Sequence, residues 1–249
     1  MLDGLPVALI EAAYSAAPGN EIASGKFAHP ESSACLVANA FGPFLTDPQS
    51  LPALPRCTQV RWPALSVRLE AELQFPWRGG MHPWLDVAIE YDNALVAVES
   101  KRYEPYRERK QATWPGAYWR DWGGAMASFE RLRDLLNSNS IKFEQLDAVQ
   151  LVKHAFGLRT EAYRRAPSKC PVLYYLFAEP RSWPDGRPVE EAKRVQHRAE
   201  IETFANFAAG AEVEFQACSY SELLRTWEEA GDSRLHKHAR AVTMKFTDL

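Results

Sequence analysis

The sequence of 249 residues predicts an α/β protein in which helices flank a mixed β-sheet. Residues 66–75 alternate strictly between apolar and polar side chains, which is typical of a half-exposed strand. Residues 85–91 and 94–101 are two apolar runs separated by an Asp-Asn pair, which favours a hairpin turn because both residues tolerate positive φ. Residues 171–177 are continuously apolar, as in a strand buried on both faces.

Helical patterns lie before and after these strands. One helix is expected to begin at Glu31-Ser32-Ser33, where a hydroxyl can cap the first turn, and to end at Gly42-Pro43. The basic stretch around His236 and His238 is interpreted as a solvated tail. Further helices are predicted at 5–16, about 122–137, about 143–158, 188–209 and 219–227, with a short strand at 213–217. We expect a single domain over 1–249, with a core at about 19–178 and a C-terminal helical and strand extension at 179–249.

The expected hairpin register brings acidic and basic side chains together. If the Asp-Asn pair is the loop, Tyr91 faces Ala94, and each later pair keeps the same sum of residue numbers, so Asp86 falls opposite Glu99. Directly opposed residues on antiparallel strands share a face and lie about 4.5–5.5 Å apart. Lys101, two residues after Glu99, points to the same face.

This grouping predicts a metal site. Two carboxylates so close would repel each other unless a ligand used them. Hard oxygen ligands suit Mg²⁺, which typically takes one or two carboxylates and keeps several waters. The alternative is that Asp86 caps a turn, while Glu99 and Lys101 are surface charges of an edge strand.

Other candidate residues flank the hairpin. Glu70 and Glu72 lie on the polar face of the strand at 66–75, and we slightly favour Glu72 as a third carboxylate; an exposed strand face with alternating charges is the alternative. Gln150 and His154 are one turn apart on a predicted helix.

The segment after the hairpin interleaves basic residues with tyrosines. This pattern suits contact with a phosphate backbone and nearby bases, and local packing of a solvated connection is equally compatible with it. The residues expected to bind nucleic acid are Arg102, Tyr103, Arg107, Arg109 and Lys110.

Composition narrows the functional classes. The net charge is −3, so the chain as a whole does not attract polyanions, and any such contact must come from local patches. The four cysteines form no Cys-x-x-Cys pair, which favours reduced thiols in a cytoplasmic protein. Neither Gly-x-x-x-x-Gly-Lys nor Gly-x-Gly-x-x-Gly occurs, so no nucleotide cofactor is expected. No run reaches the ~18 apolar residues of a membrane span, so no membrane association is expected.

The order of elements and motifs resembles the PD-(D/E)xK nuclease superfamily, which has the restriction-endonuclease-like fold. The signature is Asp86, a gap of twelve residues and then Glu99-Ser100-Lys101, with Leu85 in place of the proline that names the motif. Within the superfamily the chain is similar to a group of bacterial restriction-endonuclease-like proteins, and the resemblance covers roughly 19–178. The other matching residues are Ser32, Ser33, Asn39, Phe41, Glu70 or Glu72, Tyr103 and Glu104.

The resemblance implies an αβββαβ core with extra helices and Mg²⁺-dependent hydrolysis of DNA in defence or repair. Asp86 and Glu99 would hold one or two Mg²⁺ ions, with Mn²⁺ as a substitute, helped by the Ser100 carbonyl and by Glu72. Lys101 would orient or deprotonate the attacking water, and Gln150 would support the site from the following helix. DNA is the expected partner, and a homodimer is plausible because cutting both strands often needs two sites. The alternative is a catalytically inactive nucleic-acid-binding or assembly protein that retains the nuclease fold.

Overall fold

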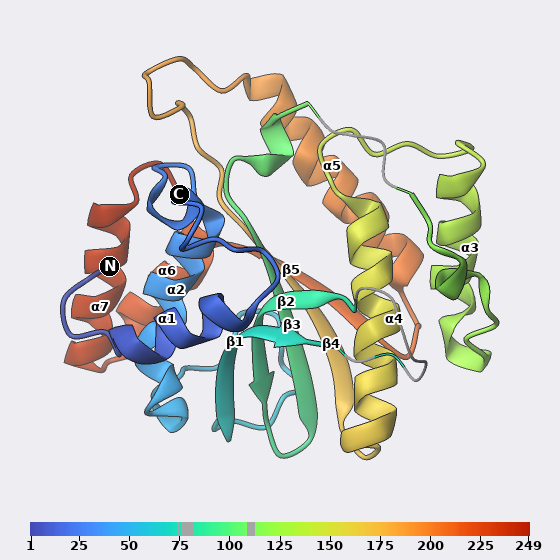
Figure 1. Cartoon of the computed structure of the whole chain (residues 1–249), viewed down its shortest axis with the longest axis horizontal. Coiled ribbons are helices and arrows are strands. Elements are labelled where there is room, and N and C mark those ends of the chain that lie inside the picture. Colours follow the sequence, from blue (N-terminus) through green and yellow to red (C-terminus); the bar gives the residue numbers. More distant parts are fainter. Residues whose placement is uncertain (74, 76–81, 109–112) are drawn as a thin grey trace.

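The computed structural model describes residues 1–73, 75, 82–108 and 113–249 (Figure 1). Its centre is a five-stranded mixed sheet in the order β1-β2-β3-β4-β5. The β1–β2 and β2–β3 pairs are antiparallel, and the β3–β4 and β4–β5 pairs are parallel. Helices cover both faces, so the predicted α/β class with a mixed sheet is confirmed. The strands are β1 (Ser66–Glu72), β2 (Trp84–Glu90), β3 (Ala94–Lys101), β4 (Cys170–Phe177) and β5 (Glu214–Ser219).

Two groups of helices bury the two faces of the sheet. The first face packs against α1 (Val7–Ala16), α2 (Ser33–Phe41), α6 (Tyr220–Glu229) and α7 (Ser233–Lys245). The second face packs against α3 (Ala127–Asn137), α4 (Ala148–Arg165) and α5 (Glu191–Ala208). Short 3-10 helices occupy Lys26–Ala28, Gly42–Leu45, Pro48–Ser50, Glu104–Tyr106, Gly116–Trp119 and Gly124–Met126.

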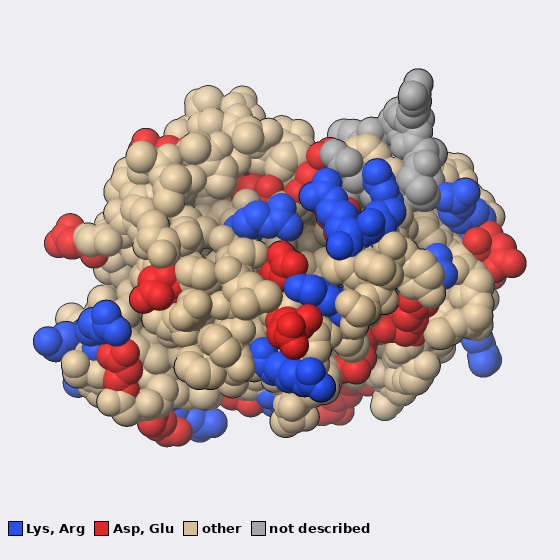
Figure 2. Space-filling view, turned by 90° about the horizontal axis from the view of Figure 1, so that it is seen from below, with Lys and Arg blue, Asp and Glu red and all other residues tan. Residues whose placement is uncertain are grey.

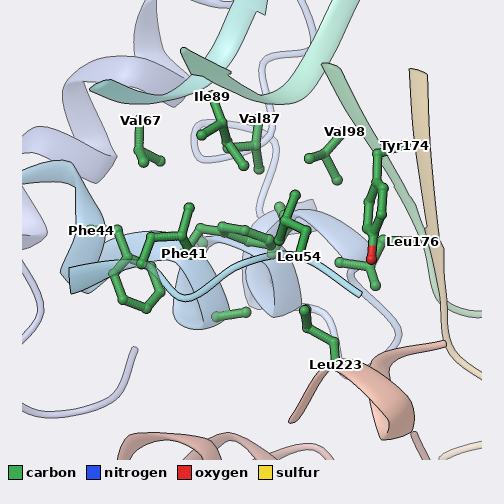
Figure 3. Packing of buried hydrophobic residues seen from close by; sticks show 14 of the residues in the cluster. Phe41, Phe44, Leu54, Val67, Val87, Ile89, Val98, Tyr174, Leu176 and Leu223 are labelled. Carbon is green, nitrogen blue, oxygen red and sulfur yellow. The ribbon is translucent and has the colours of Figure 1, made fainter. Parts of the chain in front are cut away.

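Alternation along β3 separates the two cores. Val96 and Val98 belong to the first core, whereas Leu95 and Ala97 belong to the second. All of β3 except Lys101 is buried, which explains its apolar sequence. Figure 3 shows the first core, in which aromatic side chains of α2 and the following turn pack under the strands.

The hairpin has the predicted register. The Tyr91 amide donates to the Ala94 carbonyl at 2.9 Å, and the ladder continues to the pair Val87–Val98. The next positions along this register are Asp86 and Glu99. The predicted hairpin register is therefore confirmed over the pairs of the ladder, which ends one position before Asp86 and Glu99.

The expectation of one continuous apolar face on the first strand is wrong. Val67 and Leu69 pack in the first core, but Leu73 and Phe75 pack in the second. Between them Glu70 has a φ of +48°, in the left-handed region that non-glycine residues rarely adopt, and this conformation interrupts the alternation.

The buried side chains of β2 also change from one core to the other at this level of the sheet. Val87 belongs to the first core and Leu85 to the second, with Asp86 between them. The β1–β2 register pairs Leu69 with Val87 and Ala71 with Leu85, so Glu70 and Asp86 are the opposed residues in between. Both carboxylates therefore lie where the two strands pass from one core to the other.

The C-terminal residues differ from the predicted solvated tail. They form α7, whose N-cap residue Asp232 accepts hydrogen bonds from the amides of Arg234 and Leu235. Its buried residues Leu235, Ala239 and Val242 recur at helical spacing and pack in the first core. In the described part of the chain, no helix is both long enough and apolar enough to cross a membrane.

Candidate active site

Asp86 connects the two strands of the hairpin at the end of their ladder. Its Oδ2 accepts a hydrogen bond of 2.6 Å from the Ser100 amide. On the other face of β3, the Ser100 hydroxyl lies 2.7 Å from the Tyr220 hydroxyl of α6. These contacts fix the backbone of β3 at Ser100, between Glu99 and Lys101.

Glu99 is buried, with 3% of its surface exposed, and it lies between two basic side chains. Lys101 Nζ contacts Oε1, and His154 Nδ1 from α4 lies 3.2 Å from Oε2. His154 is also buried. A buried carboxylate needs such partners because leaving its charge unpaired would be costly. The structure thus brings Glu99, Lys101 and His154 together.

The helix residue that reaches Glu99 is His154, whereas the sequence favoured Gln150. Gln150 lies in the first turn of α4, where its amide donates to the Asp147 carboxylate at 2.9 Å. His154 is one turn further along and faces the C-terminal end of β3. The i, i+4 spacing identified both residues, but only the packing of α4 decides which of them meets Glu99.

Glu70 and Asp86 line a cavity of about 520 Å³ between the strands and the N-terminal helices. The sequence slightly favoured Glu72 as the third carboxylate, but among the described residues Glu70 lines this cavity and Glu72 does not. The reason is the left-handed conformation of Glu70, which a regular alternating pattern does not reveal. The other lining residues are Gly19, Glu21, Lys26, His29, Glu31, Ser32, Ser33, Ala34, Tyr103, Glu104 and Arg107.

The carboxylates of the site have unequal proton affinities. Burial, together with the charge of Glu99, raises the pKa of Asp86 well above its ordinary value. Burial and the charges of Glu21 and Glu99 raise the pKa of Glu70 to about 7. Burial also raises the pKa of Glu99, but Lys101 and His154 outweigh this and hold it at about 2.

Lys101 is a cation in this arrangement. Burial lowers its pKa, but the negative charges of Glu99, Asp86 and Glu104 outweigh burial and raise the pKa above the ordinary value. A lysine with a raised pKa holds its proton at neutral pH, so it is suited to stabilising negative charge.

The donor set fits a hard divalent cation with few protein ligands. In the described ranges, no three His, Cys, Asp or Glu side chains are close enough together to hold an ion by themselves. Mg²⁺ does not need three, because it commonly takes one or two carboxylates and keeps its waters. Asp86 and Glu70 open onto a cavity that can hold those waters, and a cation would offset the burial and the neighbouring negative charges that raise their pKa values.

The remaining residues of the sequence motifs support this region. Ser32 caps α2 by accepting from the Cys35 amide at 3.0 Å. Ser33 donates to Glu104 Oε1 at 2.5 Å, and the Arg102 amide donates to Glu104 Oε2 at 2.7 Å. The start of α2 and the segment after the hairpin are therefore joined at the cavity wall.

The segment expected to bind nucleic acid is largely used for internal contacts. Arg102 is only 5% exposed, and its guanidinium donates to the Pro30 and Thr247 carbonyls. Tyr103 is buried and stacks on Trp183 with ring centroids 5.1 Å apart. The expectation that Arg102 and Tyr103 form a nucleic-acid surface is corrected by this burial.

Arg107 is exposed, but it forms an ion pair with Glu31. Arg109 and Lys110 lie outside the described residues. Of the five residues named for nucleic-acid binding, Arg107 is thus the one that the structure describes at the surface.

Comparison with known proteins gives one finding. The model of the family described as restriction endonuclease associating with ARP matches residues 12–245. Neither the curated proteins nor the solved structures contain a match to this chain.

Proposed function

The chain belongs to the family of restriction endonucleases associating with ARP, and from this membership and the site geometry we propose that it is a PD-(D/E)xK nuclease acting on DNA. The observation that carries the proposal is the meeting of Asp86, Glu99 and Lys101 on one hairpin. They follow the order Asp…Glu-x-Lys, and the acidic cavity opens at Asp86.

Mg²⁺ or Mn²⁺ would be held by Asp86 and Glu70, with Glu99 and the Ser100 carbonyl adjacent. When bound, the ion supplies Lewis-acid activation of the scissile phosphate and lowers the pKa of a bound water. We include Glu70 in place of Glu72 because Glu70 lines the cavity with Asp86.

Lys101 stabilises the negative charge that builds up on the phosphate. Its raised pKa favours this role over deprotonation of the attacking water. Glu99 holds the ammonium in place through Oε1, and His154 holds Glu99 through Oε2. His154 is therefore a positioning residue that acts through Glu99.

The arrangement around Glu99 also supports the second candidate function, an inactive member that binds nucleic acid or takes part in an assembly. Both oxygens of Glu99 already contact basic side chains, so a metal would have to share this carboxylate. The family description names association with ARP, and a role for this chain beside such a partner, in defence or repair, belongs to the same proposal.

Cleavage of plasmid DNA in the presence of Mg²⁺ tests the nuclease proposal. Asp86→Asn and Lys101→Met should each lower the cleavage rate by about a thousandfold or more, because each removes a charge that acts on the reacting phosphate. Glu72→Gln is the matched control and should retain the wild-type rate. His154→Gln should lower the rate by about tenfold, while Gln150→Ala should leave it unchanged.

The result separates the two candidate functions. Equal cleavage by wild type, Asp86→Asn and Lys101→Met would assign the activity to a contaminant and overturn the proposed site. Wild-type protein that binds DNA but cuts none with either metal would favour the inactive binding protein. Gel filtration with light scattering, applied to the protein bound to DNA, would measure the mass of the complex and show whether a homodimer is the form that cuts both strands.

A further inference from the structure

A DNA-binding protein with this charge distribution needs a basic surface apart from the site. The net charge is −3, and five carboxylates line the cavity at Asp86. Arg102 is buried, and Arg107 is paired with Glu31. Contacts of arginine and lysine with the phosphate backbone supply much of the affinity in protein–DNA complexes. Lys26 is exposed at this cavity, but one lysine and a paired arginine are few contacts for a duplex, so binding needs further basic residues outside the site.

A second cavity, of about 220 Å³, lies along the C-terminal half of α4 and is rich in arginine. Arg120, Arg159 and Arg164 line it together with a single acidic residue, Asp121. The Asp121 carboxylate is engaged in a turn, where it accepts from the Gly123 amide at 2.8 Å. The remaining lining residues are Trp122, Thr160 and Tyr163.

Aromatic residues form part of the wall of this cavity and give it an exposed ring face. Trp122 is buried and stacks on Phe156 with ring centroids 4.4 Å apart. The Arg159 guanidinium lies 4.2 Å from the ring centroid of Tyr163, which is 58% exposed, and the Arg159 Nε lies 3.4 Å from Glu212 Oε2. A guanidinium has five N–H donors and matches phosphate geometry, so it can bind a phosphate and keep a local contact. Exposed tyrosines provide a face for a sugar or a base.

The α4 helix links this cavity to the candidate active site. His154 contacts Glu99, and Arg164 lies ten residues later, which is about 15 Å along the helix axis. That length corresponds to about four to five base pairs of a DNA duplex at 3.4 Å per pair. One duplex is therefore long enough to reach from the candidate active site to Arg164.

Pro83 and Phe75, which precede β2, also contact α4. A Cβ on Gly157 of α4 would lie 2.6 Å from Pro83 Cγ, so the Pro83 ring, three residues before Asp86, packs directly against the helix at Gly157. Arg164 Nη1 lies 3.5 Å from the Phe75 carbonyl oxygen. The C-terminal end of α4 points to the lower side of Figure 1, and Figure 2, which views that side, shows Lys and Arg side chains with Asp and Glu among them.

We infer that the cavity lined by Arg120, Arg159 and Arg164 is a phosphate-binding surface for the DNA duplex. This inference rests on the proposed nucleic-acid substrate and assigns the backbone contacts to Arg120 and α4 instead of the residues directly after the hairpin. The contacts recognise the backbone and carry no sequence information.

Equilibrium binding of a fluorescently labelled 24-base-pair duplex, measured in EDTA so that no strand is cut, tests the inference. The double variant Arg159→Glu/Arg164→Glu should raise the dissociation constant at least tenfold. The slope of log affinity against log salt should fall in magnitude by about two, because each lost phosphate contact removes about 0.9. The matched control is Arg187→Glu/Arg234→Glu, which reverses two arginines whose side chains are 73% and 80% exposed. The control should bind like wild type.

A milder variant keeps the test decisive if charge reversal disturbs folding. Arg159→Gln/Arg164→Gln removes the two charges while keeping the polar surface, and it should still weaken binding severalfold and lower the salt slope. Circular dichroism and thermal unfolding verify that each variant is folded. The inference is overturned if the folded α4 variants weaken binding no more than the control pair, or if wild type binds no DNA.

The outcome is distinguishable from failure of the nuclease proposal. If binding depends on Arg159 and Arg164 but wild type cuts no DNA with Mg²⁺ or Mn²⁺, the phosphate-binding surface stands and the nuclease proposal fails. If wild type cuts DNA through Asp86 and the folded α4 variants bind and cut equally well, the nuclease proposal stands and this inference is overturned.

Discussion

Two cavities of this protein differ in charge and in how the fold creates them. The cavity at Asp86 collects carboxylates where β1 and β2 pass from one core to the other. The cavity along α4 collects two arginines of a regular helix and Arg120 from the segment before α3, beside a stacked aromatic pair. Carboxylates attract a cation and guanidinium groups attract phosphate, so the two regions suit complementary parts of the metal-dependent reaction on DNA that we propose.

The comparison shows that a broken pattern and a regular pattern can both build a site. The acidic cavity depends on a strained residue, Glu70, whose φ of +48° takes its side chain out of the strand alternation. The basic cavity depends on ordinary helical spacing, which puts Arg159 and Tyr163 one turn apart. We expect the acidic cavity to be more sensitive to single substitutions.

The largest expected effect concerns divalent cations, which should bind at the acidic cavity. Glu70→Gln should weaken Mn²⁺ binding by about ten- to a hundredfold, measured by electron paramagnetic resonance or calorimetry, because it removes one of the two carboxylates proposed to hold the ion. Glu72→Gln is the matched control on the same strand. Equal loss of Mn²⁺ affinity in both variants would show that Glu70 is not a ligand distinct from Glu72, and would contradict the proposed metal site in the acidic cavity.

A smaller effect is expected at the close contact between α4 and the start of β2. Gly157→Ala should destabilise the protein by about 1–2 kcal/mol, since the new Cβ would lie 2.6 Å from the rigid Pro83 ring. In the middle of an ordinary helix, replacing glycine by alanine would instead stabilise the protein by about 0.5–1 kcal/mol. Gly116→Ala, at a site with nothing within 4 Å, is the control, and chemical denaturation measures both. A stabilised Gly157→Ala variant would show that α4 and β2 are not held together at this point.

The smallest expected effect is a pH dependence confined to the acidic cavity. The pKa of Glu70 is about 7 in the folded protein against 4.5 for an ordinary glutamate. The folded state therefore binds the Glu70 proton more tightly than the unfolded state does. The stability from this proton is present below about pH 4.5 and is lost as pH rises through about 7.

Glu70→Gln removes this dependence. In EDTA it should raise the free energy of unfolding by about 1 kcal/mol at pH 8 relative to wild type, with little difference at pH 5. Arg159→Gln, in the basic cavity, should show the same difference from wild type at both pH values. Parallel stability curves for Glu70→Gln and wild type would contradict the raised pKa of Glu70.

Much of the fold could be predicted because it depends on local patterns. The Asp-Asn turn fixed the hairpin register, and the apolar run at 171–177 correctly marked a buried strand. The C-terminal helix was missed, although Asp232 and the buried Leu235, Ala239 and Val242 carry a capping and spacing signal. The many charged residues of that stretch hid this signal.

The candidate site was predicted less completely. Asp86, Glu99 and Lys101 followed from the hairpin, because two residues close in register must be close in space. Glu70 and His154 could not be chosen over Glu72 and Gln150, because the choice depends on a backbone distortion and on how α4 packs on β3. The burial of Arg102 was equally hidden, since it depends on carbonyls of residues 30 and 247.

The sequence by itself determined the α/β class, the hairpin and the acidic and basic residues at its end, since turn chemistry and side-chain periodicity act between near neighbours. Only the tertiary structure decided which glutamate enters the cavity, which helix residue meets Glu99 and where the arginines gather. Those outcomes depend on contacts between segments far apart in the chain, and a buried charge takes whichever partner the packing brings within reach.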